Sequence, residues 1–404
     1  MPFSYRMLGR TSRQYILSMG LANLSTYVFQ AYFIIYLQVS GLTYFEMSIV
    51  YAVNLVLCAL LGLPMGNIAD RFGRRRGFAI GAAIMSVSML IYAMNRTFSA
   101  FLVAEAFWAL GWALLNGSNE AWVIDQLGKE GRAHEGARTF TAMMIVSYTM
   151  GIVGGAMASL LVTYSLNMPF VGATIIALIC TVLVWTRLPE NYGSEKVKLS
   201  TILGDSLSFY KESRGLQLLT AGETFRYVAQ LIYLFLYQPY LVSTGLGAEL
   251  LGVYFSVLMI TSATGSLIAP PLAGRIGTHR VMAASSFGLC AGFVLLAMSP
   301  GLAASCVLFA LCGLSNGLGW PAMMVWRNRL VPSRIRASAL ALFSSFTYLA
   351  GAVVSMVLGA LLDIAPPAAG FALAALIAVT SVPMYVQAAS GKAFWRRGTS
   401  PVVR

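Results

Sequence analysis

Long apolar stretches alternate with short polar segments along the whole chain. Each stretch holds about 20 residues, the length that a helix needs to cross the hydrocarbon core of a bilayer. Because lipid offers no partner to free backbone groups, such stretches should be helical. The pattern therefore predicts about twelve membrane-spanning helices, at residues 15–37, 47–68, 77–94, 98–124, 140–163, 168–186, 216–242, 251–272, 281–298, 302–326, 337–362 and 368–386.

The composition agrees with an all-α integral membrane protein and excludes a water-soluble globule. Hydrophobic residues make up 58% of the chain and charged residues only 10%, against about a quarter in soluble domains. We therefore expect a multi-pass protein of the cytoplasmic (plasma) membrane, with the lipid bilayer as its surroundings.

The basic residues gather on one side of the predicted spans. An even number of spans puts both ends of the chain on the same side, and that side then holds every lysine and arginine except Arg96 and Arg226. Since positive loops face the cytoplasm, both termini should be cytoplasmic. The formal net charge of +13 then reflects membrane topology, and no nucleic-acid partner is expected.

The second half of the sequence repeats the first. A shift of 204 residues places the segment from Tyr36 to Arg76 on the segment from Tyr240 to Arg280 without a gap, with eleven identical residues. Such a repeat predicts two six-helix halves of the same topology. The expected domains are an N-terminal half at residues 1–187, a cytoplasmic linker at 188–215, and a C-terminal half with a cytoplasmic tail at 216–404.

Apolar residues recur at helical spacing within the linker. They predict a short helix that lies on the inner membrane surface, with a loose tether as the alternative.

A short basic segment joins the second and third spans. Its sequence is GNIADRFGRRR, from Gly66 to Arg76. It resembles the signature loop of the major facilitator superfamily, G-x-L-A-D-R-x-G-R-R, with one conservative change at Ile68. The resemblance covers almost the full chain, because the two predicted halves have the parallel-repeat topology of that family. It implies a bacterial-type secondary transporter, with drug efflux as one variety.

The resemblance also implies a role for charged side chains at the cytoplasmic mouth. In the family, residues equivalent to Asp70, Arg74 and Asp125 stabilise the outward-facing state. Salt bridges here would hold the inner side shut in one state and break in the other, whereas a cluster that only fixes topology is the alternative. The candidate cytoplasmic gate residues are Asp70, Arg71, Arg74, Arg75, Asp125 and, in the weaker second copy of the loop, Arg275.

Polar and aromatic residues recur at helical spacing inside four of the spans. Polar groups are costly in a membrane and usually functional. Spans one, four, seven and ten line the central cavity in the family, so the periodicity and the resemblance agree. The candidate cavity residues are Asn23, Tyr27, Gln30, Trp108, Trp112, Asn116, Gln230, Tyr233, Tyr237, Asn316 and Trp320. Plain core packing is the alternative for the tryptophans.

Three ionisable residues inside the spans are candidates for proton coupling: Glu105, Glu223 and Arg226. Glu105 has no basic neighbour on its own helix, and loss of water favours the neutral form of a carboxyl group. It is a candidate proton carrier, with an uncharged glutamate bonded to a neighbouring span as the alternative. Glu223 and Arg226 are three residues apart, so an ion pair within one helix is the alternative to a role in substrate or proton binding.

The sequence favours a carrier over other classes of protein. It contains no phosphate-binding loop for ATP and no set of nucleophile, base and metal ligands, and its two histidines, His134 and His279, stand alone in loops. We therefore expect that the protein is not an enzyme and that it binds no metal and no cofactor. The sequence predicts a monomeric secondary transporter of a small molecule that works by alternating access and is coupled to protons, with the substrate gradient alone as the alternative driving force.

The direction of transport stays open. The aromatic cavity faces slightly favour efflux of amphipathic compounds, although the chain lacks the membrane-embedded arginine and the Gly-Pro pair of many proton antiporters of the family. The rival is uptake of a small polar or anionic metabolite, in which Arg226 would meet a carboxylate or phosphate. A non-transporting receptor on the same scaffold would bind its ligand without flux.

Overall fold

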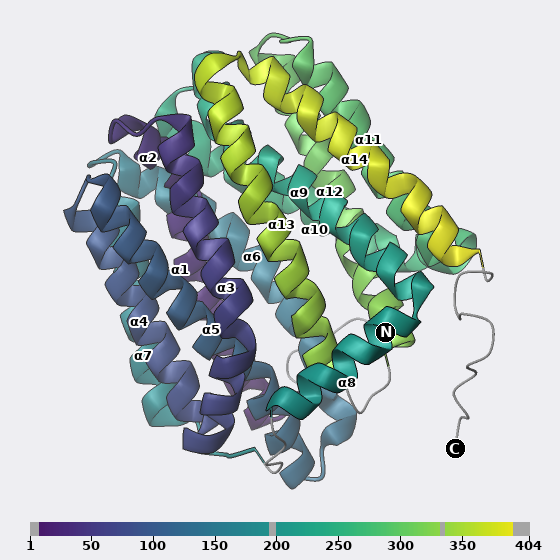
Figure 1. Cartoon of the computed structure of the whole chain (residues 1–404). Helices are drawn as coiled ribbons and strands as arrows, with labels where there is room; N and C mark the ends of the chain where they lie inside the picture. The colour runs from purple at the N-terminus through teal and green to yellow at the C-terminus, as the bar shows by residue number, and fades with distance from the viewer. Residues whose placement is uncertain (1–7, 194–198, 332–335, 391–404) are drawn as a thin grey trace. The chain divides into compact units, whose positions relative to one another are not determined.

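The computed structural model describes residues 8–193, 199–331 and 336–390, and the regular structure of these ranges is helical (Figure 1). Short 3-10 turns at Ala133–Glu135 and Ala248–Leu250 precede α6 and α10. The helices are α1 (Arg10–Gln30), α2 (Phe33–Val39), α3 (Tyr44–Phe72), α4 (Arg74–Met94), α5 (Phe98–Lys129), α6 (Gly136–Val162), α7 (Met168–Arg187), α8 (Leu199–Glu212), α9 (Arg214–Ser243), α10 (Leu251–Ile276), α11 (Thr278–Ala297), α12 (Leu302–Leu330), α13 (Arg336–Ile364) and α14 (Pro367–Ala389).

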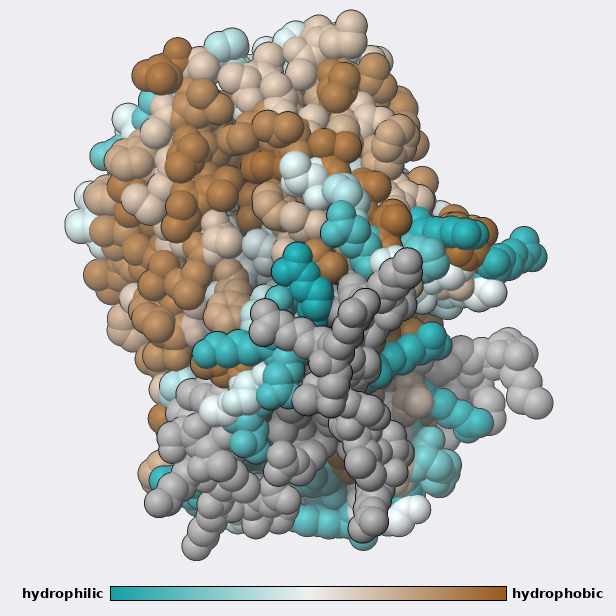
Figure 2. Space-filling model, turned by 45° about the vertical axis from the view of Figure 1, so that its right-hand side comes forward, coloured by the Kyte–Doolittle hydropathy of each residue, from teal (hydrophilic) through white to brown (hydrophobic). Residues whose placement is uncertain are grey.

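Ten helices of the described ranges are long and apolar enough to cross a membrane, namely α3 to α7 and α10 to α14. Two more, α1 and α9, have 21 and 30 residues, but side chains such as Asn23 and Arg226 make them more polar. Together they account for the twelve expected spans. Apolar side chains cover most of the face seen in Figure 2, and hydrophilic ones gather toward one end. The all-helical, multi-pass architecture is therefore confirmed.

The first predicted span is not one helix. The helix α1 ends at Gln30, and α2 begins only at Phe33. Between them the backbone of Tyr32 leaves the helical region, at φ −128° and ψ 6°. The Tyr32 hydroxyl donates to the carbonyl oxygen of Glu249 at 2.9 Å and lies 3.2 Å from the Ser159 hydroxyl. These bonds to distant segments hold the break in place, and hydropathy alone does not reveal them.

The helix α8 lies within the predicted linker. Its Tyr210 ring packs against Phe343 and Phe346 of α13, with ring centres 5.3 Å and 5.5 Å apart. The linker is therefore partly a docked helix, while its residues 194–198 lie outside the described ranges.

The chain packs as two compact units. The first holds α1, α2, α4 to α7, the part of α3 from Val53 onward, and the segment Gly247–Met259 at the start of α10. The second holds the remaining helices together with the segment Thr43–Ala52 at the start of α3. Two helices, α3 and α10, thus contribute to both units.

Small residues permit close helix packing in each unit. In the first unit, a Cβ atom on Gly81 of α4 would lie 2.7 Å from the carbonyl oxygen of Gly111 on α5. In the second unit, a Cβ atom on Gly317 of α12 would clash with the carbonyl oxygen of Ser262 on α10. Backbones approach closely where the side chain is a single hydrogen, and this brings the polar residues of neighbouring helices within bonding distance.

Candidate functional site

A buried carboxyl group lies in the first unit. Glu105 of α5 is 3% exposed. One of its carboxyl oxygens accepts a hydrogen bond from the Tyr92 hydroxyl of α4 at 2.6 Å, and the other accepts from the side-chain amide of Asn54 on α3 at 2.7 Å. In the described ranges, no lysine or arginine forms a salt bridge with it. Because only neutral groups hold this carboxyl, nothing ties it to one charge state, as a proton carrier requires.

The second unit contains a buried cluster of two arginines and one glutamate. Glu223 of α9 pairs with Arg327 of α12 at 2.7 Å, and both side chains are less than a tenth exposed. Arg327 also donates to the carbonyl oxygen of Leu340 at 3.0 Å. The salt bridge of Glu223 is thus not the one within its own helix, to Arg226, that was the alternative to a role in binding. The helix α12 continues beyond its expected end at residue 326, so Arg327 enters the protein and binds this carboxylate instead.

Arg226 is the second arginine of this cluster and is 1% exposed. Its Nη1 atom donates to the side-chain oxygen of Asn316 on α12 at 3.0 Å, and Tyr385 of α14 also interacts with it. Its Nε atom is buried without a hydrogen-bond partner among the described residues. A Cβ atom on Gly319 would lie 3.0 Å from Nη1, so the glycine makes room for the guanidinium. The cluster therefore carries one more positive charge than its carboxylate can cancel.

Three of the predicted cytoplasmic gate residues, Asp70, Arg74 and Asp125, form a compact ionic cluster in the first unit. Arg74 of α4 donates to Asp70 of α3 at 2.7 Å, to Asp125 of α5, and to the carbonyl oxygen of Ala121 at 2.9 Å. One arginine thus joins the ends of three helices. A gating role for these contacts stays a prediction.

The other gate candidates are Arg71 and Arg75 in the first unit and Arg275 in the second. Arg75 lies 3.4 Å from Glu190 and, on its other side, over the ring of Trp185. Arg71 and Arg275 are exposed and have no salt bridge in the part of the chain that the structure describes.

The segment that follows α7, residues 188–193, packs over the signature loop. This contact was not predicted from the sequence. The carbonyl oxygen of Pro189 accepts a hydrogen bond from the Trp122 indole at 2.8 Å. The carbonyl oxygen of Asn191 accepts one from the backbone amide of Arg74 at 2.9 Å. The Glu190 carboxylate accepts from the Arg75 amide at 2.8 Å. Glu190, an acidic residue shortly after a span, was the sequence signal for this contact. Its basic partners, Arg75 and Arg76, lie more than 100 positions earlier, so the sequence does not show that they meet.

The remaining candidates lie in varied surroundings. Asn23 and Tyr27 both bond to Ser147 of α6, at 3.2 Å and 3.0 Å. Trp108 is buried and stacks on Phe29 of α1. Gln30, Asn116 and Trp320 are exposed; Trp112, Gln230 and Asn316 are half-buried; Tyr233 and Tyr237 are buried.

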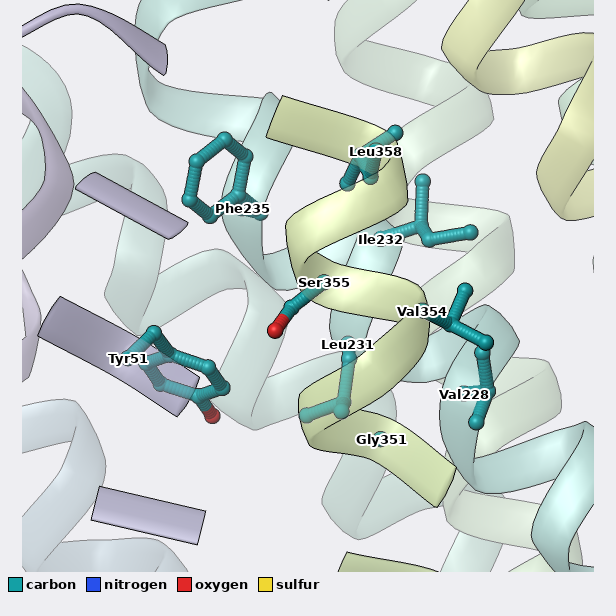
Figure 3. A pocket seen from close by; sticks show the side chains of 9 residues that line it. All are labelled: Tyr51, Val228, Leu231, Ile232, Phe235, Gly351, Val354, Ser355 and Leu358. Atoms are coloured by element: carbon teal, nitrogen blue, oxygen red, sulfur yellow. The ribbon is translucent and has the colours of Figure 1, made fainter. Parts of the chain in front are cut away.

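A small cavity in the second unit is too small for a solute. It lies between α9, α13 and the start of α3, and Figure 3 shows its nine lining side chains. Seven of these residues are apolar or glycine, and the hydroxyl groups come from Tyr51 and Ser355. Its volume of about 10 Å³ has room for one water molecule. It is a packing gap rather than a substrate site.

Comparison with known proteins supports the architecture. The profile of the Major Facilitator Superfamily matches residues 15–236 and 219–393. The crystal structure of the nucleoside transporter NupG superposes with a TM-score of 0.78 at 16% identity, covering 95% of this chain and 100% of that chain. The crystal structure of a D-xylose-proton symporter superposes with a TM-score of 0.72 at 16% identity, covering 93% and 96%. At such low identity the two structures show the fold alone.

Two curated relatives are also transporters. The uncharacterized MFS-type transporter YxaM of Bacillus subtilis (strain 168) is 22% identical over 373 residues, which cover 90% of both chains. The molybdate-anion transporter of Xenopus laevis is 24% identical over 308 residues, which cover 73% of this chain and 67% of the relative. Since the family profile matches both halves and the relatives are transporters rather than enzymes, the chain belongs to the major facilitator superfamily.

Proposed function

We propose that this chain is a secondary transporter that takes up a small anionic solute by alternating access. The observation that carries the proposal is Arg226, a cation that is 1% exposed inside the second unit. An unpaired charge in a membrane protein is costly, so it persists where it has a function.

The nearest acidic group does not neutralise Arg226. Glu223 interacts with it electrostatically, but its salt bridge is to Arg327. Within the described ranges, no carboxylate lies within salt-bridge distance of Arg226. A carboxylate, phosphate or other oxyanion would cancel the excess charge, and a guanidinium can bind two of its oxygens at once. The name of the Xenopus laevis relative, a molybdate-anion transporter, agrees with an oxyanion as the solute.

We assign proton coupling to Glu105. Its partners, Tyr92 and Asn54, are neutral and come from two other helices. Protonation of Glu105 would remove the charge that both bonds stabilise, so these contacts between α3, α4 and α5 would respond to the proton. A proton carried with an anion also reduces the charge that crosses the membrane.

Efflux of amphipathic compounds is the weaker candidate. The case for efflux depends on aromatic side chains that face a cavity. Trp108, however, is buried in a stack with Phe29 and Trp112. Tyr233 packs against Phe309 with ring centres 5.7 Å apart. These rings are occupied by packing, and Trp320 is the aromatic candidate that is clearly exposed, at 45%.

Exchange in liposomes tests the proposal. The purified chain is reconstituted, and counterflow of labelled molybdate, phosphate, succinate and uridine is measured beside extrusion of a cationic dye. We expect exchange of at least one anion by the wild type and its loss in Arg226→Gln. Exchange should be weakened in Arg226→Lys, because lysine keeps the positive charge but lacks the planar guanidinium group. Arg329→Gln, an exposed arginine at the end of α12, is the matched control.

Three results would contradict the proposal. Anion exchange that is unchanged in Arg226→Gln would remove the assigned role of this residue. Dye extrusion without anion exchange would favour the efflux alternative. Binding of an anion without exchange would favour a receptor. Unchanged melting temperatures in the variants separate these results from loss of folding.

A further inference from the structure

An apolar groove on the first unit ends in exposed cations. The groove encloses about 460 Å³ along α7. Four of its five apolar side chains are about half exposed, with Val182 at 62%. The lining residues are Ile175, Leu178, Ile179, Val182, Leu183, Thr186 and Arg187.

Two arginines flank the same end of this groove. Arg187 is exposed, and in the described ranges no carboxylate lies within salt-bridge distance of it. Gln14 of α1 donates to the carbonyl oxygen of Arg187 at 2.8 Å, so the first turns of α1 run beside the end of α7. Arg10 is exposed one turn before Gln14 on the same face of α1. Arg10 therefore lies about one turn of α1 away from the residue that bonds to Arg187.

We propose that this groove along α7 binds an anionic phospholipid, with the phosphate against Arg187 and Arg10 and one acyl chain along α7. The stretch from Ile175 to Arg187 spans about 18 Å at 1.5 Å per residue, close to the roughly 15 Å depth of one leaflet. Trp185, 48% exposed next to Arg187, is a residue type that prefers the interface between membrane and water. A free anion would leave the apolar length of the groove unused, and a zwitterionic lipid would leave the two cations uncompensated.

Lipid retention by the full-length protein tests the site. The chain is purified in detergent with phosphatidylglycerol or phosphatidylcholine, and retained lipids are counted by native mass spectrometry. We expect preference for phosphatidylglycerol by about 25-fold, because each of the two arginines contributes roughly fivefold beside an anionic headgroup. Arg187→Gln and Arg10→Gln should each lower retention about fivefold, whereas Arg329→Gln on α12 should leave it unchanged.

A second variant tests the position of the acyl chain. Val182→Trp fills the groove and leaves both arginines in place, so it should lower retention of phosphatidylglycerol without changing the melting temperature of the lipid-free protein. Equal retention of the two lipids by the wild type, or unchanged retention in Arg187→Gln, would overturn the site. Unchanged retention in Val182→Trp would overturn the placement of the chain along α7.

Discussion

Two buried ionisable residues, Glu105 and Arg226, have no salt bridge among the described residues. Glu105 is held by a tyrosine and an asparagine, and Arg226 by an asparagine and a tyrosine. Each therefore has neutral hydrogen-bonding partners, which is the observation behind the roles proposed for them. The pair of Glu223 and Arg327 is different, because each member cancels the other. This contrast separates residues suited to transport from residues suited to stability.

Replacement of Glu105 separates solute movement from proton movement. In Glu105→Gln the side chain keeps its size but no longer takes up a proton. We expect solute-dependent proton flux to disappear from liposomes, while exchange of solute for solute continues. Glu212→Gln, an exposed glutamate of α8, should keep both activities. Proton flux at the wild-type rate in Glu105→Gln would assign the coupling to another group.

Removal of one member of the buried ion pair should destabilise the protein. Glu223→Gln leaves Arg226 and Arg327 buried without a carboxylate, and breaking such a pair costs about 3–5 kcal/mol. The double variant Glu223→Gln/Arg327→Gln removes one charge of each sign, so its melting temperature should lie closer to that of the wild type. Melting in detergent measures this. If the double variant lost as much stability as Glu223→Gln and Arg327→Gln lose in total, the two residues would not act as a unit.

The sequence predicted individual residues better than their partners. Arg74 and Asp70 are four residues apart on the signature loop, so their contact follows from local geometry. The partner of Glu223 lies 104 positions away, at a residue expected outside the membrane. Asn54 and Tyr92 were not singled out, because their role depends on how three helices pack around Glu105. Contacts of this kind are tertiary and leave no periodic signal.

At the scale of elements, hydropathy located the spans but misplaced several ends. Helices continue past the hydrocarbon layer, so α5 extends to Lys129 and α12 to Leu330. Hydropathy stops where polar residues begin, although these residues are still helical and still packed. The break at Tyr32 is the opposite case, since an apolar run is interrupted by hydrogen bonds that the tyrosine makes elsewhere in the first unit.

Two glycines in different helices should respond oppositely to alanine. Gly317→Ala places a Cβ atom against the Ser262 carbonyl oxygen, and overpacking of this kind costs about 1–3 kcal/mol. Gly204 of α8 has open space around it, so Gly204→Ala should stabilise this helix by about 0.5–1 kcal/mol. Melting temperatures of the two variants test the pair. A lower melting temperature in both variants would mean that α8 needs its glycine for another reason.

At the scale of the whole molecule, the repeat predicted two halves but not the exchange of helix ends between the units. Similarity between the halves is a property of the sequence, whereas packing decides which unit a helix end belongs to. The start of α3 is held in the second unit by Asp363 at the end of α13. Its carboxylate accepts from the backbone amides of Tyr44 at 2.8 Å and Phe45 at 3.2 Å.

Loss of this anchor should expose the packed start of α3. In a variant without native cysteines, a cysteine is placed at Ser48, which is fully buried and lies against Gly359 of α13. Asp363→Ala removes both bonds to the helix start, and loss of such a cap, worth about 1 kcal/mol, should speed alkylation by a water-soluble maleimide roughly fivefold. Glu212→Ala serves as the control. Equal rates with and without Asp363 would show that the anchor does not govern opening.

The sharing of α3 and α10 has a consequence for how the protein is made. A chain cut between α7 and α8 would leave the first fragment without Gly247–Met259 and the second without Thr43–Ala52. Each fragment would be missing a piece of its own packing and would expose the surface that receives it. Fragments produced in separate cells should therefore be degraded, while the same fragments produced together should complement each other and be recovered as one complex.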